Sequence, residues 1–206
     1  MRIGIYGGTF DPPHIAHLIL AGEASFQLNL GRILWLLTPV SPLKNDHSIS
    51  PWQQRLELLN AAIDGNPAFE LTRVDIDRTG PHYAFESMHI LRRMYENDKL
   101  FYLMGEDSLR DLPHWERPDL LLDACSSLGV MRRPGTMLDL KNLEQKIPGL
   151  KAKLCWIDAP LLEISGKLIR KRILHAQPFR YFLPERVYQL IIENGYYEFG
   201  GENKKG

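Results

Sequence analysis

The sequence predicts an α/β fold, namely a Rossmann-like, doubly wound and mostly parallel sheet with helices on both faces. Short apolar runs rich in β-branched residues alternate along the chain with segments whose apolar residues recur at helical spacing. Several of the apolar runs end at a glycine or a proline. The 206 residues suffice for one such domain with a large core. We expect a single domain over residues 1–200 and a disordered tail over 201–206.

The first quarter of the chain contains two predicted strands, one helix and one loop. RIGIY (2–6) is short, apolar and β-branched, and it runs into glycine, as a buried strand does. HIAHLILAGEASFQL (14–28) has apolar residues every third or fourth position and predicts a helix. RILWLLTP (32–39) predicts a second buried strand that ends at proline. SPLKNDHSIS (41–50) is polar and irregular, which predicts a loop.

The next four segments repeat the alternation. PWQQRLELLNAAIDGNP (51–67) has a proline at its start and a glycine near its end, the preferred chemistry of helix ends. FELTRVDID (69–77) alternates apolar and polar residues, which predicts a strand. PHYAFESMHILRRMYEND (81–98) predicts a helix with proline in its first turn, and KLFYLMG (99–105) predicts a buried strand that stops at glycine.

The last part of the chain completes the pattern. SSLGVMRRPG (126–135) predicts a strand that ends in a basic turn, and KLCWIDAP (153–160) predicts the final strand. SGKLIRKRILHA (165–176) and PERVYQLIIENGYY (184–197) predict two closing helices.

Polar or glycine-rich segments follow the predicted strands. In open parallel sheets, ligands bind beyond the carboxyl ends of the strands. The segments are GGTFDPPH (7–14), TPVSPLKN (38–45), GEDS (105–108), RRPG (132–135) and ISGKLIRKR (164–172). Their convergence predicts one ligand-binding crevice at that edge.

The composition excludes several classes of protein. Lys plus Arg number 25 and Asp plus Glu number 25, so the formal charge is zero and a broad nucleic-acid-binding surface is not expected. The two cysteines, Cys125 and Cys155, are far apart, which argues against a disulfide framework or a four-ligand zinc site and fits a reducing cytoplasm. With neither a basic leader nor a run of about 18 apolar residues, we expect no signal peptide and no membrane span.

Gly7 and Gly8 precede a predicted helix start that carries His14 and His17. Glycine lets backbone approach a ligand closely, and a helix N-terminus offers free N–H groups, so this corner can bind a phosphate. Each imidazole can donate an N–H to a phosphate oxygen. The residues alone leave alternatives open, namely a tight turn without a ligand, a zinc-binding pair, or a capping or core histidine. The pattern is neither a P-loop nor GxGxxG.

Five segments carry a resemblance to a known family. GGTFDPPHIAHL resembles the GxFDPxHxGH signature of a nucleotidyltransferase superfamily, with Ala16 in place of the last glycine. DRTGPHY resembles the R-x-G-x-S-Y segment of bacterial nicotinate-nucleotide adenylyltransferases, and LMGEDSLRDLPHW resembles their G-x-D-x-L…W segment. GVMRRPG resembles their strand followed by R-P-G, and ISGKLIRKR resembles their ISSTxIR motif. The resemblance extends from residue 3 to residue 197.

The resemblance implies an enzyme that joins nicotinate mononucleotide to ATP and releases pyrophosphate, in NAD biosynthesis. It implies Mg²⁺ bound with ATP, these two small molecules as partners without nucleic acid or membrane, and a cytoplasmic location. The attacking phosphate is already an anion at neutral pH, so alignment and charge neutralisation can supply the catalysis without a general base. No carboxylate cluster in the sequence indicates a metal site built by the protein.

The resemblance also implies three sets of site residues. The catalytic set is His14, His17, Lys44 and Arg170. The ATP-binding set is Gly7, Gly8, Thr9, Phe10, Gly105, Asp107, Ser165 and Ile169. The nicotinate-mononucleotide-binding set is His82, Tyr83, Ala84, Trp115 and Arg132.

Some of these residues have a structural alternative. Lys44 can be a solvated surface lysine, and Trp115 can be a core residue instead of a platform for the pyridine ring. Asp107 can bind the adenosine ribose or cap a helix that begins at Ser108. Asp11 is expected to fix the turn rather than to bind metal.

The chain departs from the family pattern at several positions. Leu43 stands where the family has histidine, and Gly166 and Lys167 stand where it has Ser and Thr. His82 and Ala84 flank Tyr83 in place of the usual hydroxyl residues, so backbone N–H groups at the helix start must receive the nicotinate carboxylate. Two rival functions stay open at this point, namely another nucleotidyltransferase of the superfamily and a nucleotide-binding sensor without turnover.

Overall fold

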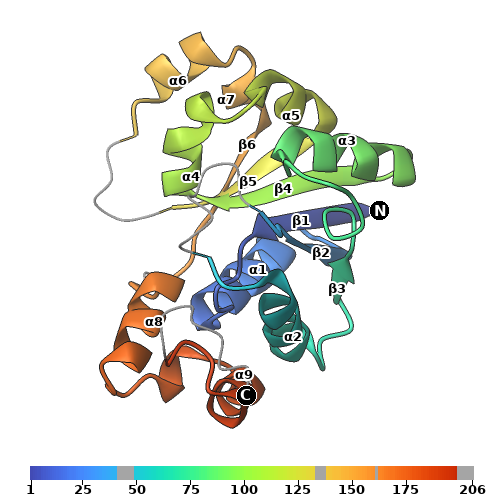
Figure 1. Ribbon diagram of the computed structural model, residues 1–206. Helices are drawn as coiled ribbons and strands as arrows, with labels where there is room; N and C mark the ends of the chain where they lie inside the picture. The colour runs from blue at the N-terminus through green and yellow to red at the C-terminus, as the bar shows by residue number, and fades with distance from the viewer. Residues whose placement is uncertain (41–48, 133–137, 161, 199–206) are drawn as a thin grey trace.

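The computed structural model describes residues 1–40, 49–132, 138–160 and 162–198. Its centre is a six-stranded sheet in which every neighbouring pair of strands is parallel (Figure 1). The strands are β1 (Arg2–Gly8), β2 (Arg32–Leu37), β3 (Phe69–Thr72), β4 (Lys99–Gly105), β5 (Ser127–Met131) and β6 (Leu154–Ile157). Their order is β3-β2-β1-β4-β5-β6. The predicted doubly wound α/β fold is therefore confirmed.

Helices cover both faces of the sheet (Figure 1). One face carries α1 (Ile15–Gln27), α2 (Trp52–Ile63), α8 (Gly166–Leu174) and α9 (Glu185–Asn194). The other carries α3 (Ala84–Met94), α4 (Glu106–Asp111), α5 (Pro118–Ala124), α6 (Leu140–Lys146) and α7 (Leu150–Lys153). Two short 3₁₀ helices, η2 (Leu112–His114) and η3 (Arg180–Phe182), connect the larger elements. None of the helices in the described ranges is long and apolar enough to span a membrane.

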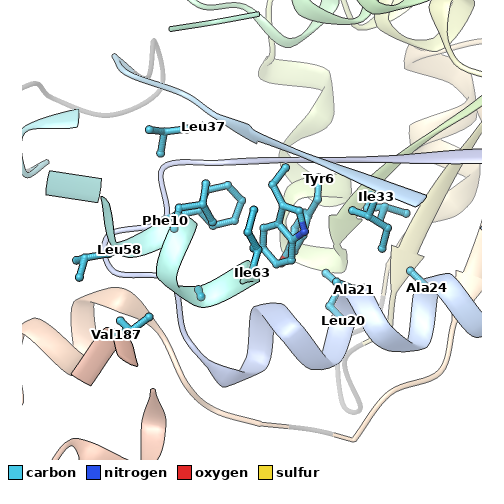
Figure 2. Close-up of a cluster of buried hydrophobic side chains, with 14 of the residues drawn as sticks. Tyr6, Phe10, Leu20, Ala21, Ala24, Ile33, Leu37, Leu58, Ile63 and Val187 are labelled. Carbon is cyan, nitrogen blue, oxygen red and sulfur yellow. The ribbon is translucent and has the colours of Figure 1, made fainter. Parts of the chain in front are cut away.

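Two hydrophobic cores lie on opposite sides of the sheet, because successive side chains of a strand point to opposite faces. Along β1, Ile3 and Ile5 face the α3–α7 layer, whereas Tyr6 faces the α1–α2 layer. Figure 2 shows the latter core, in which Tyr6 and Phe10 pack among aliphatic side chains of α1, β2 and α2. Nearly all of these side chains are fully buried, so both faces of the sheet are held rigidly.

The sheet order creates the crevice that the sequence predicted. β1 and β4 are neighbours, yet the chain continues from β1 toward β2 and from β4 toward β5, on opposite sides. The connections that leave their carboxyl ends therefore diverge and leave an opening at this switch point.

Several of the predicted elements differ in extent. The helix predicted over 81–98 extends over Ala84–Met94, and Pro81 precedes its N-cap, Tyr83, instead of lying in its first turn. The strand predicted over 69–77 ends at Thr72, since the side chain of Asp75 beyond it accepts hydrogen bonds from Arg78 and Ser87 instead of continuing the ladder. The strands predicted over 126–135 and 153–160 are likewise shorter. The helix considered from Ser108 is α4, which begins earlier, at Glu106. The helices α5 to α7 were not predicted, because helices of four to seven residues are too short to show a periodic pattern. The predicted tail over 201–206 lies outside the described residues, and the single domain over 1–200 stays a prediction.

Candidate functional site

A cavity of about 670 Å³ opens at the carboxyl ends of β1 and β4. Its lining combines residues from both ends of the chain, because α8 lies beside the β1–α1 loop. Eleven of the residues singled out from the sequence line it: Gly7, Gly8, Thr9, Phe10, His14, His17, Gly105, Asp107, Trp115, Ser165 and Arg170. Segments that are far apart in the sequence thus meet in one concave site.

Other residues of the predicted sets lie elsewhere. Ile169 is fully buried in the core between the sheet and α8, so its side chain packs and does not line the cavity. Arg132 is exposed, with its guanidinium 5.0 Å from the centre of the Trp156 ring. Tyr83 and Ala84 begin α3 outside the cavity lining, and Lys44 lies outside the described residues.

His82 is engaged by backbone rather than exposed to a ligand. Its ring is buried, with Nδ1 3.3 Å from the carbonyl oxygen of Val40 and Nε2 3.3 Å from that of Arg78. The imidazole therefore connects the end of β2 to the turn before α3. Both ring nitrogens thus lie near backbone carbonyl oxygens, and the place of His82 in the mononucleotide-binding set stays a prediction.

His14 and His17 form a fixed pair at the start of α1. The backbone N–H of His14 donates to Nδ1 of His17 over 3.1 Å, and the backbone N–H of His17 donates to the His14 carbonyl over 2.9 Å. The two rings are stacked, with their centres 3.6 Å apart. Because Nδ1 of His17 accepts a hydrogen bond, the ring proton of His17 resides on Nε2, which makes that nitrogen a donor.

The His14 side chain is in an unusual electrostatic state. It is only 6% exposed, and its Nδ1 is buried without a hydrogen-bond partner among the described residues. Burial lowers the pKa of His14 to about 4, so the ring is neutral at physiological pH. His14 lines the cavity, so its ring can offer a ligand a hydrogen bond from a neutral imidazole.

The glycine pair lies against the side chains of Tyr102 and Phe10. A Cβ on Gly7 would lie 2.6 Å from the hydroxyl oxygen of Tyr102, and a Cβ on Gly8 would lie 3.2 Å from the Phe10 ring. Phe10 has φ +46°, a strained conformation for a residue with a side chain, and its ring is buried against Tyr6 and Trp35. The loop between β1 and α1 thus presents its backbone to the cavity near His14 and His17. We call this part of the cavity the phosphate corner.

The N-terminus of α8 closes the other side of the corner. Ser165 caps this helix, since its Oγ accepts the N–H of Leu168 over 3.2 Å. A Cβ on Gly166 would lie 2.3 Å from the carbonyl oxygen of Asp11, so only glycine permits this approach. The departure from the family serine therefore has a physical reason, because helix and loop are in backbone contact here. Lys167 also lines the cavity and brings a positive charge to it.

Asp11 is the anchor of the loop. Its buried carboxylate accepts the N–H of Ser50 over 3.2 Å, and Arg170 Nη1 lies 3.2 Å from its Oδ2. Arg170 also donates to the carbonyl oxygen of Asp11. These contacts hold α8 and the loop together and agree with the expectation that Asp11 fixes the turn.

A buried arginine supports the same loop from below. The Arg55 side chain is fully buried and donates to the carbonyl oxygens of Thr9, Thr38, Pro39 and Ser50 over 2.6–2.9 Å. Burial lowers the pKa of its guanidinium, and the charge of Asp11 opposes that shift. The sequence analysis missed Arg55. The sequence does contain a hint of its role. Arg55 is a charged residue on the same face of the predicted helix as the apolar residues Leu58 and Leu59.

The β4 side of the cavity carries a carboxylate and an indole. Gly105 is the N-cap of α4, which begins at Glu106, so Asp107 lies in the first turn and is not the cap considered from the sequence. Its Oδ1 accepts a hydrogen bond from Arg110 over 2.7 Å. Trp115 follows η2 and lines the cavity, with its ring edge-on to Tyr102 at 6.3 Å between centres. Trp115 thus has one face against the α3–α7 core and access to the cavity.

Arg78 holds the turn that leads into α3. Its guanidinium donates to Asp75 and Glu86 over 3.1 and 2.8 Å, and to the carbonyl oxygen of Pro81 over 3.0 Å. Asp75 is buried and also accepts a 2.6 Å hydrogen bond from Ser87. The free N–H groups at the start of α3 are therefore presented by a rigid turn.

No cluster of three or more His, Cys, Asp or Glu side chains suited to a metal occurs in the parts of the chain that the structure describes.

Comparisons with known proteins point to one family. Residues 5–172 match the cytidylyltransferase-like family model. A Bacillus subtilis protein named "Nicotinate-nucleotide adenylyltransferase" is 37% identical over 197 residues, which cover 96% of this chain and 98% of that protein. A Thermomicrobium roseum protein named "Probable nicotinate-nucleotide adenylyltransferase" is 39% identical over 95% of this chain and 91% of that protein.

A solved structure has the same fold. The Plasmodium falciparum nicotinic acid mononucleotide adenylyltransferase complexed with NaAD superposes with a TM-score of 0.77 at 20% identity, over 98% of this chain and 99% of that one. The likeness extends over the whole α/β architecture and not over the sheet alone.

Proposed function

Because the chain belongs to the nicotinate-nucleotide adenylyltransferases within the cytidylyltransferase-like family, we propose that it transfers the adenylyl group of ATP to nicotinate mononucleotide. The products are nicotinate adenine dinucleotide and pyrophosphate, and the reaction serves NAD biosynthesis. The observation that carries this proposal is the cavity at the β1–β4 switch point, where two helix N-termini and two histidines meet. We expect the reaction to take place in the cytoplasm.

The transfer itself is a single displacement at phosphorus. A phosphate oxygen of the mononucleotide forms a bond to the α-phosphorus of ATP, and the bond from that phosphorus to the bridging oxygen breaks, so pyrophosphate leaves with the electron pair. Catalysis then depends on holding both anions in line and on stabilising charge on the transferring group. Mg²⁺ enters as part of the ATP substrate.

The histidine corner suits the α-phosphate. His17 offers an Nε2–H donor, and neutral His14 adds a second imidazole beside it. Gly8, Thr9 and Phe10 line the same cavity, and their backbone N–H groups are proposed to donate to the same phosphate. These donors are fixed before substrate binds, which is the requirement for electrostatic stabilisation of a transition state.

The α8 N-terminus suits the β- and γ-phosphates. The helix dipole and the capped first turn at Ser165 favour negative charge, and Lys167 and Arg170 add two cations. Lys44 is proposed to reach a phosphate from the loop after β2. Gly105 and Asp107 line the cavity, and they are proposed to receive the adenosine ribose, whose paired hydroxyls suit a carboxylate acceptor.

The choice of mononucleotide is proposed to rest on the start of α3 and on Trp115. Backbone N–H groups near Tyr83 and Ala84 would receive the nicotinate carboxylate, and Trp115 would stack on the pyridine ring. A neutral amide gains less at a helix N-terminus than a carboxylate, by about 1 kcal/mol or more.

The test measures pyrophosphate and dinucleotide formation by the purified chain with ATP, Mg²⁺ and either nicotinate or nicotinamide mononucleotide. We expect kcat/KM to favour the nicotinate form by about tenfold or more. Faster turnover of the amide would contradict the substrate assignment. Binding of nucleotide without pyrophosphate release would favour the sensor function.

A matched pair of histidine variants tests the corner. His17→Ala should lower kcat by about 10²–10³-fold, as loss of a transition-state donor does. His89→Ala changes an exposed histidine of α3 that lies outside the cavity and should retain full activity. If the two variants are equally active, His17 does not stabilise the transition state.

A further inference from the structure

The wall between the phosphate corner and Trp115 is made by a tyrosine that neither the family motifs nor the sequence patterns singled out. Tyr102 lies on β4, is 5% exposed, and lines the cavity. Its ring belongs to the core on the α3–α7 side of the sheet and meets Trp115 edge-on. Its hydroxyl lies over the backbone of Gly7, where a Cβ would be 2.6 Å away.

The Tyr102 hydroxyl has no hydrogen bond to any residue in the part of the chain that the structure describes. It is not one of the fully buried polar atoms that lack a partner there, so the oxygen keeps accessible surface in the cavity that Tyr102 lines. Burial raises the pKa of Tyr102, with further contributions from the thiol of Cys125 and the carboxylate of Asp75, so the hydroxyl keeps its proton. It is therefore a donor without an acceptor at the wall of a ligand cavity.

We propose that the Tyr102 hydroxyl donates a hydrogen bond to the phosphate end of the mononucleotide substrate. This inference rests on the proposed function. Gly7 belongs to the phosphate corner and Trp115 to the ring end, and the hydroxyl lies against Gly7. A contact with the triphosphate of ATP is disfavoured because the Tyr102 ring belongs to the core on the α3–α7 face, whereas His17 and α8 lie on the other face of the sheet. The adenosine ribose of ATP is already assigned to Gly105 and Asp107 at the start of α4.

The Tyr102→Phe variant tests the inference because it removes one oxygen and keeps the ring packing. We expect the Kd of nicotinate mononucleotide, measured by calorimetric titration, to rise about tenfold, while the Kd of ATP stays unchanged. Nicotinamide mononucleotide should lose the same factor, since both mononucleotides carry the same phosphate. Tyr188→Phe, in an aromatic pair with Phe179 outside the cavity, is the control and should bind as the wild type does.

Thermal unfolding separates binding from folding. Because the hydroxyl has no protein partner, Tyr102→Phe should melt at the wild-type temperature or above it. A lower melting temperature with unchanged binding would make the hydroxyl structural and overturn the inference.

The remaining outcomes are also decisive. Unchanged mononucleotide affinity, or an equal loss for ATP, would overturn the contact, and a loss confined to the nicotinate form would move it to the carboxylate end and refute the phosphate assignment. Failure of the proposed function is seen separately, as absence of pyrophosphate release by the wild type, because the titrations need no turnover.

Discussion

At the scale of single residues, His14 combines a structural and a chemical role. It is the N-cap residue of α1, its backbone is tied to His17, and its ring is buried in a neutral state. A charged imidazole would pay a desolvation cost at this position, which is why its pKa falls to about 4. The folded protein thus keeps a neutral hydrogen-bonding ring at the phosphate corner throughout the physiological pH range.

The depressed pKa of His14 predicts a pH dependence of stability. Between pH 6.5 and 4, the unfolded chain binds a proton at this residue and the folded chain does not, so the free energy of unfolding falls as the pH falls. The contribution is at most about 1.4 kcal/mol per pH unit. His14→Gln should show a shallower loss of stability across this window, measured by urea unfolding in a pH series.

His89→Gln is the matched control, because His89 is exposed and should keep the wild-type pH dependence. If His14→Gln and wild type lose stability in parallel between pH 6.5 and 4, the neutral buried state of His14 is refuted.

The sequence predicted the chemistry of the corner better than the environment of each side chain. Glycine, histidine and helix-start chemistry are local, so the pattern around His14 could be recognised without coordinates. The carbonyl partners of His82 and the contact that requires Gly166 come from residues distant in sequence, and no local pattern contains them. The position of the Tyr102 hydroxyl could not be predicted from the sequence for the same reason, because its neighbours Gly7 and Trp115 belong to other elements.

At the scale of elements, α2 stabilises the site through one side chain. Arg55 connects this helix to the β1–α1 loop through Thr9, to the end of β2 through Thr38 and Pro39, and to its own N-terminal approach through Ser50. The guanidinium fork can satisfy four carbonyl oxygens at once, which an ammonium group cannot do in this geometry.

Replacement of Arg55 should therefore be strongly destabilising. Arg55→Met removes the guanidinium donor from four partly buried carbonyl groups, and we expect the free energy of unfolding to fall by about 3 kcal/mol. Arg55→Lys keeps the charge but loses the forked guanidinium. Its free energy of unfolding should lie between those of Arg55→Met and the wild type. Equilibrium urea unfolding measures all three proteins.

Arg73→Met is a suitable control, because Arg73 is exposed and makes only a surface ion pair with Asp77. Stability of Arg55→Met equal to that of Arg73→Met would show that the four hydrogen bonds contribute nothing net.

The elements that the sequence predicted correctly are those with long periodic patterns. The helices of nine residues or more, and the buried strands β1, β2 and β4, all coincide with predicted segments. The helices α5 to α7 were not predicted because each makes at most two turns. The turn after β3 was predicted as strand because apolar and polar residues alternate there as they do in a strand. In the structure, a hydrogen bond from Arg78 to Asp75 holds this segment in a turn instead.

At the scale of the whole molecule, the site depends on joining the two ends of the sequence. The β1–α1 loop and α8 are more than 150 residues apart, as the Arg170–Asp11 separation of 159 shows. Sheet topology brings them to the same edge, and this could be anticipated from the alternation of strands and helices. The particular contact between them could not, since an ion pair across such a separation leaves no periodic trace.

The Asp11–Arg170 pair should therefore couple the C-terminal helices to the first strand. Asp11 is buried and Arg170 is 30% exposed, so the pair is partly shielded from solvent. A double-mutant cycle with Asp11→Asn and Arg170→Met should give a coupling of about 1–3 kcal/mol in the free energy of unfolding. The exposed Arg117–Asp119 pair has a closer contact, 2.7 Å against 3.2 Å, and serves as the comparison cycle.

We expect the comparison pair to couple much more weakly despite its shorter distance, because water screens exposed charges. The single variants at Asp11 and Arg170 should also raise the KM for ATP. Without this ion pair, the N-terminus of α8 is no longer held in position beside the β1–α1 loop. If the effects of Asp11→Asn and Arg170→Met on stability simply add, the two ends of the chain are held together by apolar packing of α8 and α9 alone. The pair would then act only on the ligand.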